Sequence, residues 1–145
     1  MNKQNPIRAG IAGFGLSGKI FHAPFLSADP RYALSRVYER VSEHAREEYP
    51  DVEIVHSFQE LLTGNIDLIV ITTPNQLHVP MAREALAAGK HVVVEKPAAA
   101  SSAEVEELRQ LAEERHVLFS VYQNRRLDGD FLTVKKLIQE GRLGE

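Results

Sequence analysis

A glycine-rich turn near the N-terminus restricts the possible folds of this chain more than any other feature. Gly13, Gly15 and Gly18 fit the pattern G-x-G-x-x-G; they follow the apolar run Ile7–Ala12 and precede a segment that can begin a helix. In this pattern the first glycine makes a tight turn, the second lets a pyrophosphate approach the backbone, and the third lets the helix pack closely on the strand. Glycines also form ordinary strand–helix turns, so the significance of the pattern depends on the residues C-terminal to it.

The rest of the chain alternates between strand-like and helix-like segments with short connections. Strands are predicted at residues 7–12, 32–39, 52–55, 67–72, 91–94 and 117–122, and helices at 17–28, 42–49, 58–63, 76–88, 102–116 and 130–140. Such alternation predicts an α/β fold, a doubly wound parallel six-stranded Rossmann sheet of order 3-2-1-4-5-6 with helices on both faces. Ligands bind such sheets at the carboxyl ends of the strands.

Single residues mark several of the predicted helix boundaries. Pro24 is expected to bend or end the first helix, because proline has no N–H to donate within it. Ser42 can cap the second helix and Asn75 the fourth. Ser57, with Glu60 three residues later, forms a capping-box pattern before the third helix.

Size and charge narrow the classes of function. A chain of 145 residues is long enough for one domain with a hydrophobic core, and its net charge of −3 gives no electrostatic reason to expect nucleic acid or an anionic membrane as partner. The absence of cysteine excludes disulfides, thiolate metal sites and cysteine nucleophiles, and we expect no metal site. There is no apolar stretch of signal-peptide length and no run of about 18 apolar residues, so we expect a cytoplasmic location.

The end of the second predicted strand bears on cofactor choice. Glu39 stands 21 residues after Gly18, where a carboxylate can accept hydrogen bonds from the adenosine ribose of NAD. The next residue, Arg40, can instead face the 2′-phosphate of NADP. Both can also be solvated surface charges. These residues therefore favour a dinucleotide but leave NAD and NADP both open.

Two further polar turns follow predicted strands. The stretch Thr72-Thr73-Pro74-Asn75-Gln76-Leu77-His78 follows the fourth strand, where small hydroxyl side chains can pass beside a ribose or simply form a capped turn. Glu95-Lys96-Pro97 follows the fifth, and Pro97 restricts Lys96 to an extended conformation. A lysine held in this way can orient a carbinol or carbonyl oxygen and help its proton to leave or arrive, although a strand-end lysine is often only solvated.

A donor-rich turn follows the sixth strand. Tyr122-Gln123-Asn124-Arg125-Arg126 lies on the side of the sheet where the nicotinamide half of a dinucleotide should rest. Asp128 and Asp130 can neutralise the arginines, which would then be ordinary surface charge.

Taken together, four stretches resemble the Gfo/Idh/MocA oxidoreductases, and most nearly the scyllo-inositol-dehydrogenase-like branch. They are GFGLSGKIFHAPFL, TTPNQLHVPMA, GKHVVVEKP and SVYQNRRLDGDFLTVKKLI, and the resemblance runs from about Ile7 to Gly144. It departs from the family at Leu127, where an aromatic residue is expected.

The resemblance implies an NAD(P)-binding Rossmann domain at residues 1–122, with 123–145 as a connecting loop and helix leading to a C-terminal substrate domain outside this chain. It implies hydride transfer on a sugar or cyclitol hydroxyl, a homo-oligomeric parent, and a 145-residue chain that is inactive by itself. Lys96 is the expected catalytic residue. The residues expected to bind NAD or NADP are Gly13, Phe14, Gly15, Leu16, Ser17, Gly18, Glu39, Arg40, Thr72, Thr73, Pro74, Asn75, His78, Glu95, Lys96, Pro97, Asn124 and Arg125.

Two other classes of function fit the chain less well. A stand-alone nucleotide-binding module without catalysis, such as a redox sensor or partner protein, would have no need of the lysine in the Glu-Lys-Pro turn. A methyltransferase-like Rossmann protein that binds S-adenosylmethionine would usually lack the third glycine, Gly18.

Overall fold

Six parallel strands form one sheet in the order β3-β2-β1-β4-β5-β6. The structure, a computed structural model, describes residues 5–144. Its strands are β1 (Ile7–Ala12), β2 (Tyr32–Tyr38), β3 (Glu53–Val55), β4 (Leu68–Ile71), β5 (His91–Val94) and β6 (Phe119–Val121). The predicted fold class and strand order are confirmed. Because all pairings are parallel, the carboxyl ends of all six strands meet at one edge of the sheet.

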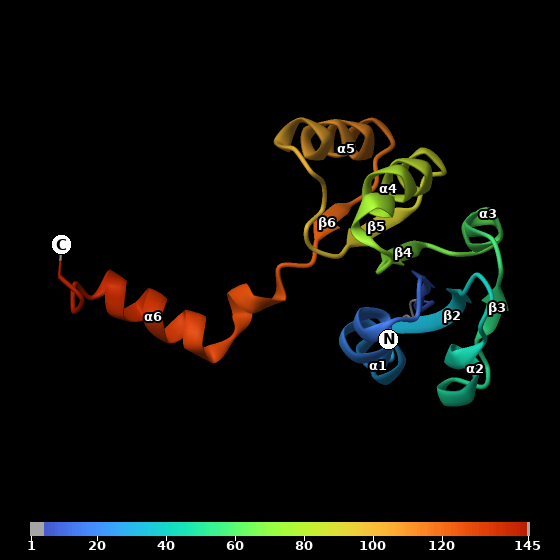
Figure 1. Ribbon diagram of the computed structural model, residues 1–145, viewed down its shortest axis with the longest axis horizontal. Helices are drawn as coiled ribbons and strands as arrows, with labels where there is room; N and C mark the ends of the chain where they lie inside the picture. The colour runs from blue at the N-terminus through green and yellow to red at the C-terminus, as the bar shows by residue number, and fades with distance from the viewer. Residues whose placement is uncertain (1–4, 145) are drawn as a thin grey trace.

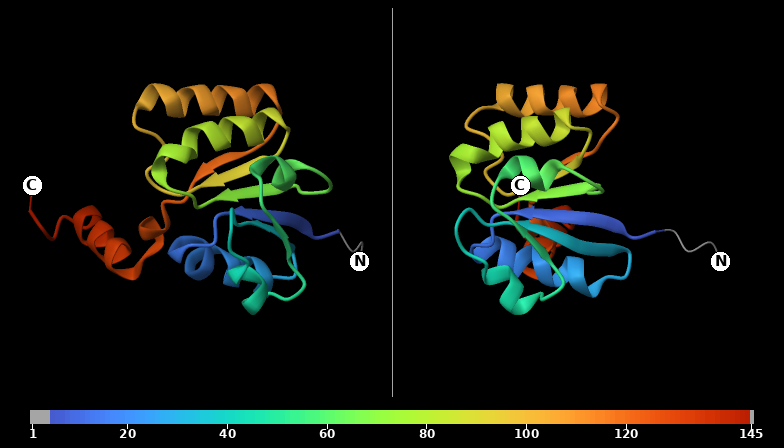
Figure 2. Two further views of the ribbon diagram at one scale, coloured as in Figure 1. Left: turned by 45° about the vertical axis from the view of Figure 1, so that its right-hand side comes forward. Right: turned by 90° about the vertical axis from the view of Figure 1, so that its right-hand side faces the viewer.

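Helices cover both faces of this sheet (Figures 1 and 2). One face carries the π-helical turn η1 (Gly18–His22), α1 (Ala23–Ala28) and α2 (His44–Glu48). The other face carries α3 (Phe58–Leu62), α4 (His78–Ala87), preceded by the short helix η2 (Asn75–Leu77), and α5 (Ser102–Glu114).

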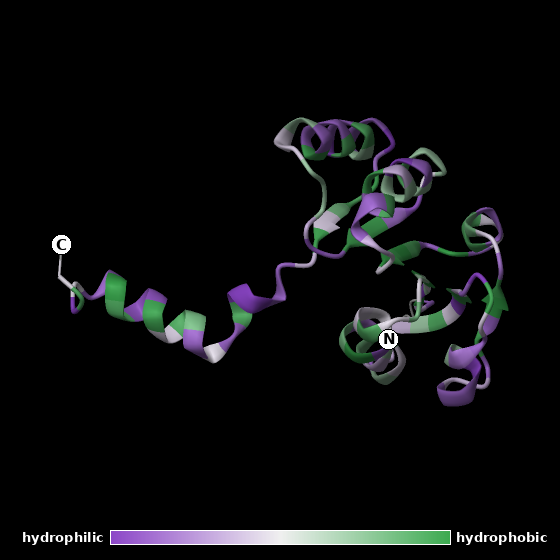
Figure 3. Cartoon of the chain, in the orientation of Figure 1, coloured by the Kyte–Doolittle hydropathy of each residue, from purple (hydrophilic) through white to green (hydrophobic). Residues whose placement is uncertain are grey.

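Each face has its own apolar core, because successive side chains of a strand point to opposite sides. On β4, Ile69 and Ile71 pack with Leu86 and Leu108 under α4 and α5, whereas Val70 packs toward α1 and α2. Figure 3 shows β4 and β5 as apolar ribbon, whereas β2 mixes apolar and polar residues. This double coverage explains why the fourth strand reads as a continuous apolar run in the sequence.

The C-terminal segment leaves the sheet. After the short helix η3 (Asn124–Leu127), α6 (Gly129–Gln139) extends away from the other elements (Figure 1). None of its residues is buried, and its apolar side chains, Phe131, Leu132, Val134 and Ile138, are exposed. This helix therefore adds little to the core of the domain.

Within residues 5–144 no helix has the length and apolar character needed to cross a membrane.

Two predicted helix caps were wrong, and the helix predicted at residues 17–28 is irregular in its first part. That segment consists of the π-helical turn η1 followed directly by α1, so its geometry changes at Ala23, next to Pro24, where a bend or an end was expected. Ser42 does not cap α2, because the carboxylate of Glu39 binds the free N–H groups there. Asn75 makes no side-chain cap; it begins η2, and α4 follows directly from that turn. The capping serine of α3, Ser57, accepts the N–H of Glu60 as predicted.

Candidate dinucleotide-binding site

The glycine turn has the geometry that its pattern predicts. Gly13 has a φ of +95°, a conformation that favours glycine. A Cβ atom on Gly18 would lie 2.4 Å from the carbonyl oxygen of Gly13, so only glycine fits where the helix meets the strand end. A Cβ atom on Gly15 would meet no atom within 4 Å. The space beside Gly15 is therefore open to a ligand, as a turn that receives a pyrophosphate requires.

Thr72, directly after β4, stabilises this turn by two hydrogen bonds. Its hydroxyl donates to the carbonyl oxygen of Gly13 at 2.7 Å, and its N–H donates to that of Ala12 at 2.9 Å. The hydroxyl of the next residue, Thr73, donates to the sulfur of Met81 at 3.3 Å. In the structure both hydroxyls are thus engaged within the protein.

A cavity of about 620 Å³ lies beside the glycine turn at the carboxyl ends of β1, β2 and β4. We call it the glycine-turn cavity. It is lined by Gly13, Phe14, Gly15, Tyr38, Glu39, Arg40, Ser42, His44, Thr73, Pro74, Gln76 and Leu77. Seven of these were predicted site residues. The other five, Tyr38, Ser42, His44, Gln76 and Leu77, were not predicted site residues, although Gln76 and Leu77 belong to the polar turn after the fourth strand.

Glu39 anchors the start of α2. Its carboxylate accepts the hydroxyl of Ser42 at 2.7 Å, the N–H of His44 at 3.2 Å and the N–H of Ala45 at 2.9 Å. The side chain is buried, with 5% exposure. Its neighbour Arg40 is exposed, and within residues 5–144 its guanidinium makes no ion pair. At the end of β2, the charged side chain that lines the cavity without a partner among the described residues is therefore the positively charged Arg40.

A second cavity, of about 390 Å³, lies on the other side of the glycine turn. We call it the lysine cavity. It is lined by Leu16, Ser17, Phe21, Glu95, Lys96, Gln123, Asn124 and Arg125. The fold thus brings together three predicted segments, from the glycine turn, the Glu-Lys-Pro turn and η3. Arg125 also pairs with Asp128 at 2.7 Å, as the sequence allowed.

Glu95, which lines the lysine cavity, is buried, with 8% exposure. One carboxylate oxygen accepts hydrogen bonds from the hydroxyl of Ser17 and from Nε2 of His22 at 3.1 Å. The other accepts the N–H of Lys96 at 3.1 Å. Burial by itself raises the pKa of Glu95, but these hydrogen bonds outweigh it and bring the pKa below the usual 4.5. The group is therefore a carboxylate at neutral pH.

His78 connects two loops of the site. Its Nε2 lies 2.8 Å from the carbonyl oxygen of Thr73, and its Nδ1 lies 2.8 Å from that of Pro97. The ring is 1% exposed and lines neither cavity. His78, which was predicted to contact the cofactor, is thus buried away from both cavities. Its ring contacts connect the loop after β4 to the Glu-Lys-Pro turn. The other predicted residues that line neither cavity are Gly18, Thr72, Asn75 and Pro97.

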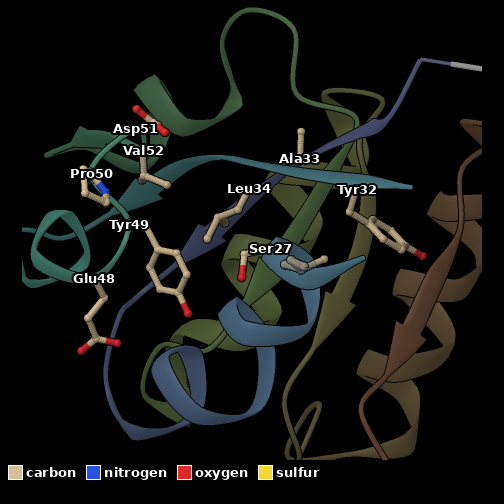
Figure 4. Close-up of a pocket in the computed structure, with 10 residues that line it drawn as sticks. Ser27, Tyr32, Ala33, Leu34, Glu48, Tyr49, Pro50, Asp51 and Val52 are labelled. Carbon is tan, nitrogen blue, oxygen red and sulfur yellow. The ribbon is translucent and has the colours of Figure 1, made fainter. Parts of the chain in front are cut away.

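A third cavity, of about 280 Å³, lies away from the predicted site residues (Figure 4). Tyr32, Ala33 and Leu34, at the amino end of β2, form one wall, and Tyr49 and Pro50 form another. It contains none of the predicted site residues. Among residues 5–144 there is also no cluster of three or more His, Asp or Glu side chains that could hold a metal ion.

Comparison with known proteins decides the family. A family model for an oxidoreductase family with an NAD-binding Rossmann fold, GFO_IDH_MocA, matches residues 7–123. The chain belongs to the Gfo/Idh/MocA oxidoreductases. The scyllo-inositol 2-dehydrogenase (NADP(+)) IolW of Bacillus subtilis is 45% identical over 142 residues, which are 97% of this chain and 40% of that protein.

Solved structures of other oxidoreductases share this fold. Biliverdin reductase from Synechocystis, solved with biliverdin and NADP+, is 35% identical, with a TM-score of 0.85 over 97% of this chain and 44% of that one. A 3-ketoreductase from Actinomadura kijaniata, solved with TDP-benzene and NADP, is 28% identical, with a TM-score of 0.90 over the same shares. The chain spans about two fifths of the length of these relatives. It carries the NAD(P)-binding domain of an oxidoreductase.

Proposed function

We propose that the chain binds NADP(H) across the glycine turn and serves an oxidoreductase that acts on a sugar or cyclitol hydroxyl. The observation that carries this proposal is the lining of the lysine cavity, to which Leu16 and Ser17 of the glycine turn contribute together with Lys96. A cofactor held by the turn would therefore have one end beside the lysine. When bound, the nicotinamide would accept or supply the hydride.

Phosphate binding would use backbone rather than side chains. The open space at Gly15 admits a pyrophosphate, and the N–H groups that follow it at the start of η1 are suited to an anion. The close contact between Gly18 and Gly13 keeps this part of the backbone in place. The adenosine half would then lie in the glycine-turn cavity and the nicotinamide half in the lysine cavity.

The side chains at the end of β2 support NADP over NAD. Three donors already engage the carboxylate of Glu39, which leaves it little capacity to accept two ribose hydroxyl groups. Arg40 is exposed at the same cavity and suits a 2′-phosphate. His44 lines the cavity beside it, and its imidazole can add a further hydrogen bond.

Lys96 would act on the substrate oxygen. Its ammonium can donate a hydrogen bond to a carbonyl oxygen that is being reduced and deliver the proton that the new hydroxyl needs. In the oxidation of a hydroxyl group, the lysine in its neutral amine form would receive the hydroxyl proton while the carbon loses its hydride. Asn124, which lines the same cavity, would help to orient the polar groups of the substrate.

Substrate binding would be completed by a second domain in the full-length oxidoreductase, reached through residues 123–145. Two observations support this part of the proposal: the chain spans 40% of the length of IolW, and α6 leaves the sheet with its apolar side chains exposed. The relative named as an inositol dehydrogenase supports a cyclitol as the substrate class.

Calorimetric titration of the 145-residue chain tests the cofactor proposal. NADPH should bind more tightly than NADH, and S-adenosylmethionine should not bind. Absence of heat with either nicotinamide dinucleotide up to millimolar concentration would refute the proposal, and binding of S-adenosylmethionine alone would favour a methyltransferase.

A further inference from the structure

His22 is a buried imidazole that the proposed function does not use. It ends the π-helical turn η1, in which the N–H of Ala23 bonds to the carbonyl oxygen of Gly18. Its side chain is 6% exposed, and its ring centroid lies 4.3 Å from that of Tyr122. Single turns of π-helix occur frequently at functional sites, because the wider turn redirects a side chain. Here the ring of His22, at the end of the turn, contacts Glu95, which lines the lysine cavity.

Glu95 links His22 to the rest of the site. The carboxylate holds Ser17 of the glycine turn and His22 through one oxygen, and the backbone N–H of Lys96 through the other. Two segments of the chain, residues 17–22 and the end of β5, thus meet at one carboxylate. The backbone of Lys96, where the chain leaves β5, is therefore hydrogen-bonded to the same carboxylate that His22 contacts.

The protonation states fix the direction of the hydrogen bond between His22 and Glu95. Burial lowers the pKa of His22 below 6.5, although the contact with Glu95 acts in the opposite sense. The ring is therefore neutral at physiological pH and donates from Nε2 to the carboxylate. The other titratable groups near the ring are Tyr122, Asp29 and Tyr32, which line a small cavity with it.

We propose that His22 is a positioning residue for Lys96 and acts through Glu95. The inference rests on the proposed function, since it concerns the lysine cavity. Ser17 borders this cavity, so atoms of a bound cofactor compete for its hydroxyl. His22 does not line it and remains a donor to Glu95 whether or not a cofactor is bound. It keeps the carboxylate, and with it the turn at Lys96, in one orientation.

Two variants separate the hydrogen bond from the packing. His22→Phe keeps a ring against Tyr122 but removes the donor, and His22→Gln restores a donor near the position of Nε2. In 15N-labelled, ligand-free chains, the Lys96 amide should change its chemical shift and exchange faster with solvent in His22→Phe. In His22→Gln it should return toward the wild-type values. An unchanged Lys96 amide in His22→Phe would overturn the proposal whether or not the chain binds a dinucleotide.

Binding of two ligands gives a second readout. The affinity for NADPH should fall about tenfold in His22→Phe, the order expected for losing a hydrogen bond to a charged group. The affinity for 2′,5′-ADP, which lacks the nicotinamide half, should stay within about twofold, and His22→Gln should recover NADPH binding.

The two readouts also separate a positioning role from a structural one. Equal losses for NADPH and 2′,5′-ADP, together with a lower melting temperature, would show that His22 only supports the fold and would overturn the inference. If the wild-type chain bound neither ligand, the proposed function would fail, and the Lys96 amide would still decide the role of His22.

Discussion

The carboxylate of Glu39 accepts the backbone N–H of Ala45 at 2.9 Å, so the acidic residue at the end of β2 is bound to the start of α2. In NAD-binding Rossmann domains an acid at this place receives the ribose hydroxyls. Here the carboxylate is buried and already has three donors. This relationship makes Glu39 a structural anchor, and under the proposed function the choice between NAD and NADP falls to Arg40.

Replacement of Glu39 tests the anchor. Glu39→Ala should lower the free energy of unfolding by about 2–3 kcal/mol, because it leaves the N–H groups of His44 and Ala45 without their partner. Urea denaturation measures the change. Glu43→Ala, on the same loop but exposed, is a matched control. Unchanged stability in Glu39→Ala, with selective loss of NADH binding, would instead show that Glu39 binds the ribose.

Arg40 should discriminate between the two cofactors. Arg40→Ala is expected to weaken NADPH binding about 10- to 100-fold, the order of one charge-assisted contact to a phosphate, and to leave NADH almost unaffected. Arg46→Ala on α2 removes an exposed arginine that pairs with Glu43 and serves as the control. Calorimetry with both cofactors measures the ratio. An equal loss for NADPH and NADH in Arg40→Ala would contradict a 2′-phosphate contact.

Gly15 and Gly18 should respond oppositely to alanine. A Cβ on Gly18 would lie 2.4 Å from backbone, so Gly18→Ala should lower the free energy of unfolding by about 1–3 kcal/mol. A Cβ on Gly15 meets nothing, so Gly15→Ala should leave stability within about 0.5 kcal/mol but obstruct the pyrophosphate and weaken NADPH binding. Denaturation and calorimetry on both variants check this. Full cofactor affinity in Gly15→Ala would place the phosphates elsewhere.

Acidification should destabilise the chain partly through His22. Burial lowers the pKa of His22 in the folded chain below its ordinary value of 6.5. At pH values between the lowered pKa and 6.5, the unfolded chain therefore binds more protons than the folded chain. The free energy of unfolding should therefore fall as the pH drops below 6.5. The lowered pKa of Glu95 adds a further loss as the pH falls below 4.5.

Urea titrations from about pH 7.5 to about pH 5 isolate the contribution of His22, since the unfolding free energy of His22→Phe should change less over this range than that of the wild type. Identical slopes in the two chains would show that His22 has an unshifted pKa.

The sequence was sufficient for the fold because its signals are local and regular. Apolar runs separated by helical segments, together with the glycine turn, predicted six parallel strands in the order that the structure has. Helix starts were less predictable. The boundary of α2 depends on Glu39, which precedes the helix and folds back onto it, so the serine beside the helix was the wrong cap.

Many residues that line the two cavities were among the predicted site residues, but the contacts that support these residues were not predicted. Lys96 and the glycine turn follow strands that lie close in the sheet, so their meeting at one cavity could be inferred from topology. The role of His22 could not be predicted, because its contact with Glu95 joins residues 73 positions apart. The contact also depends on a π-helical turn, which no local sequence pattern indicated. Similarly, His78 was expected to line the cofactor, and only its burial shows that it holds the surrounding loops.

The central claim is that one dinucleotide lies between the glycine turn and Lys96. Titration of the 15N-labelled chain with NADPH, followed by the amide shifts of each residue, tests it most directly. The amides of Gly13, Gly15 and Lys96 should shift together with one affinity, whereas those of Ala33 and Asp51, at the third cavity, should stay unchanged. Shifts confined to the third cavity, or a glycine turn that responds without Lys96, would contradict the account.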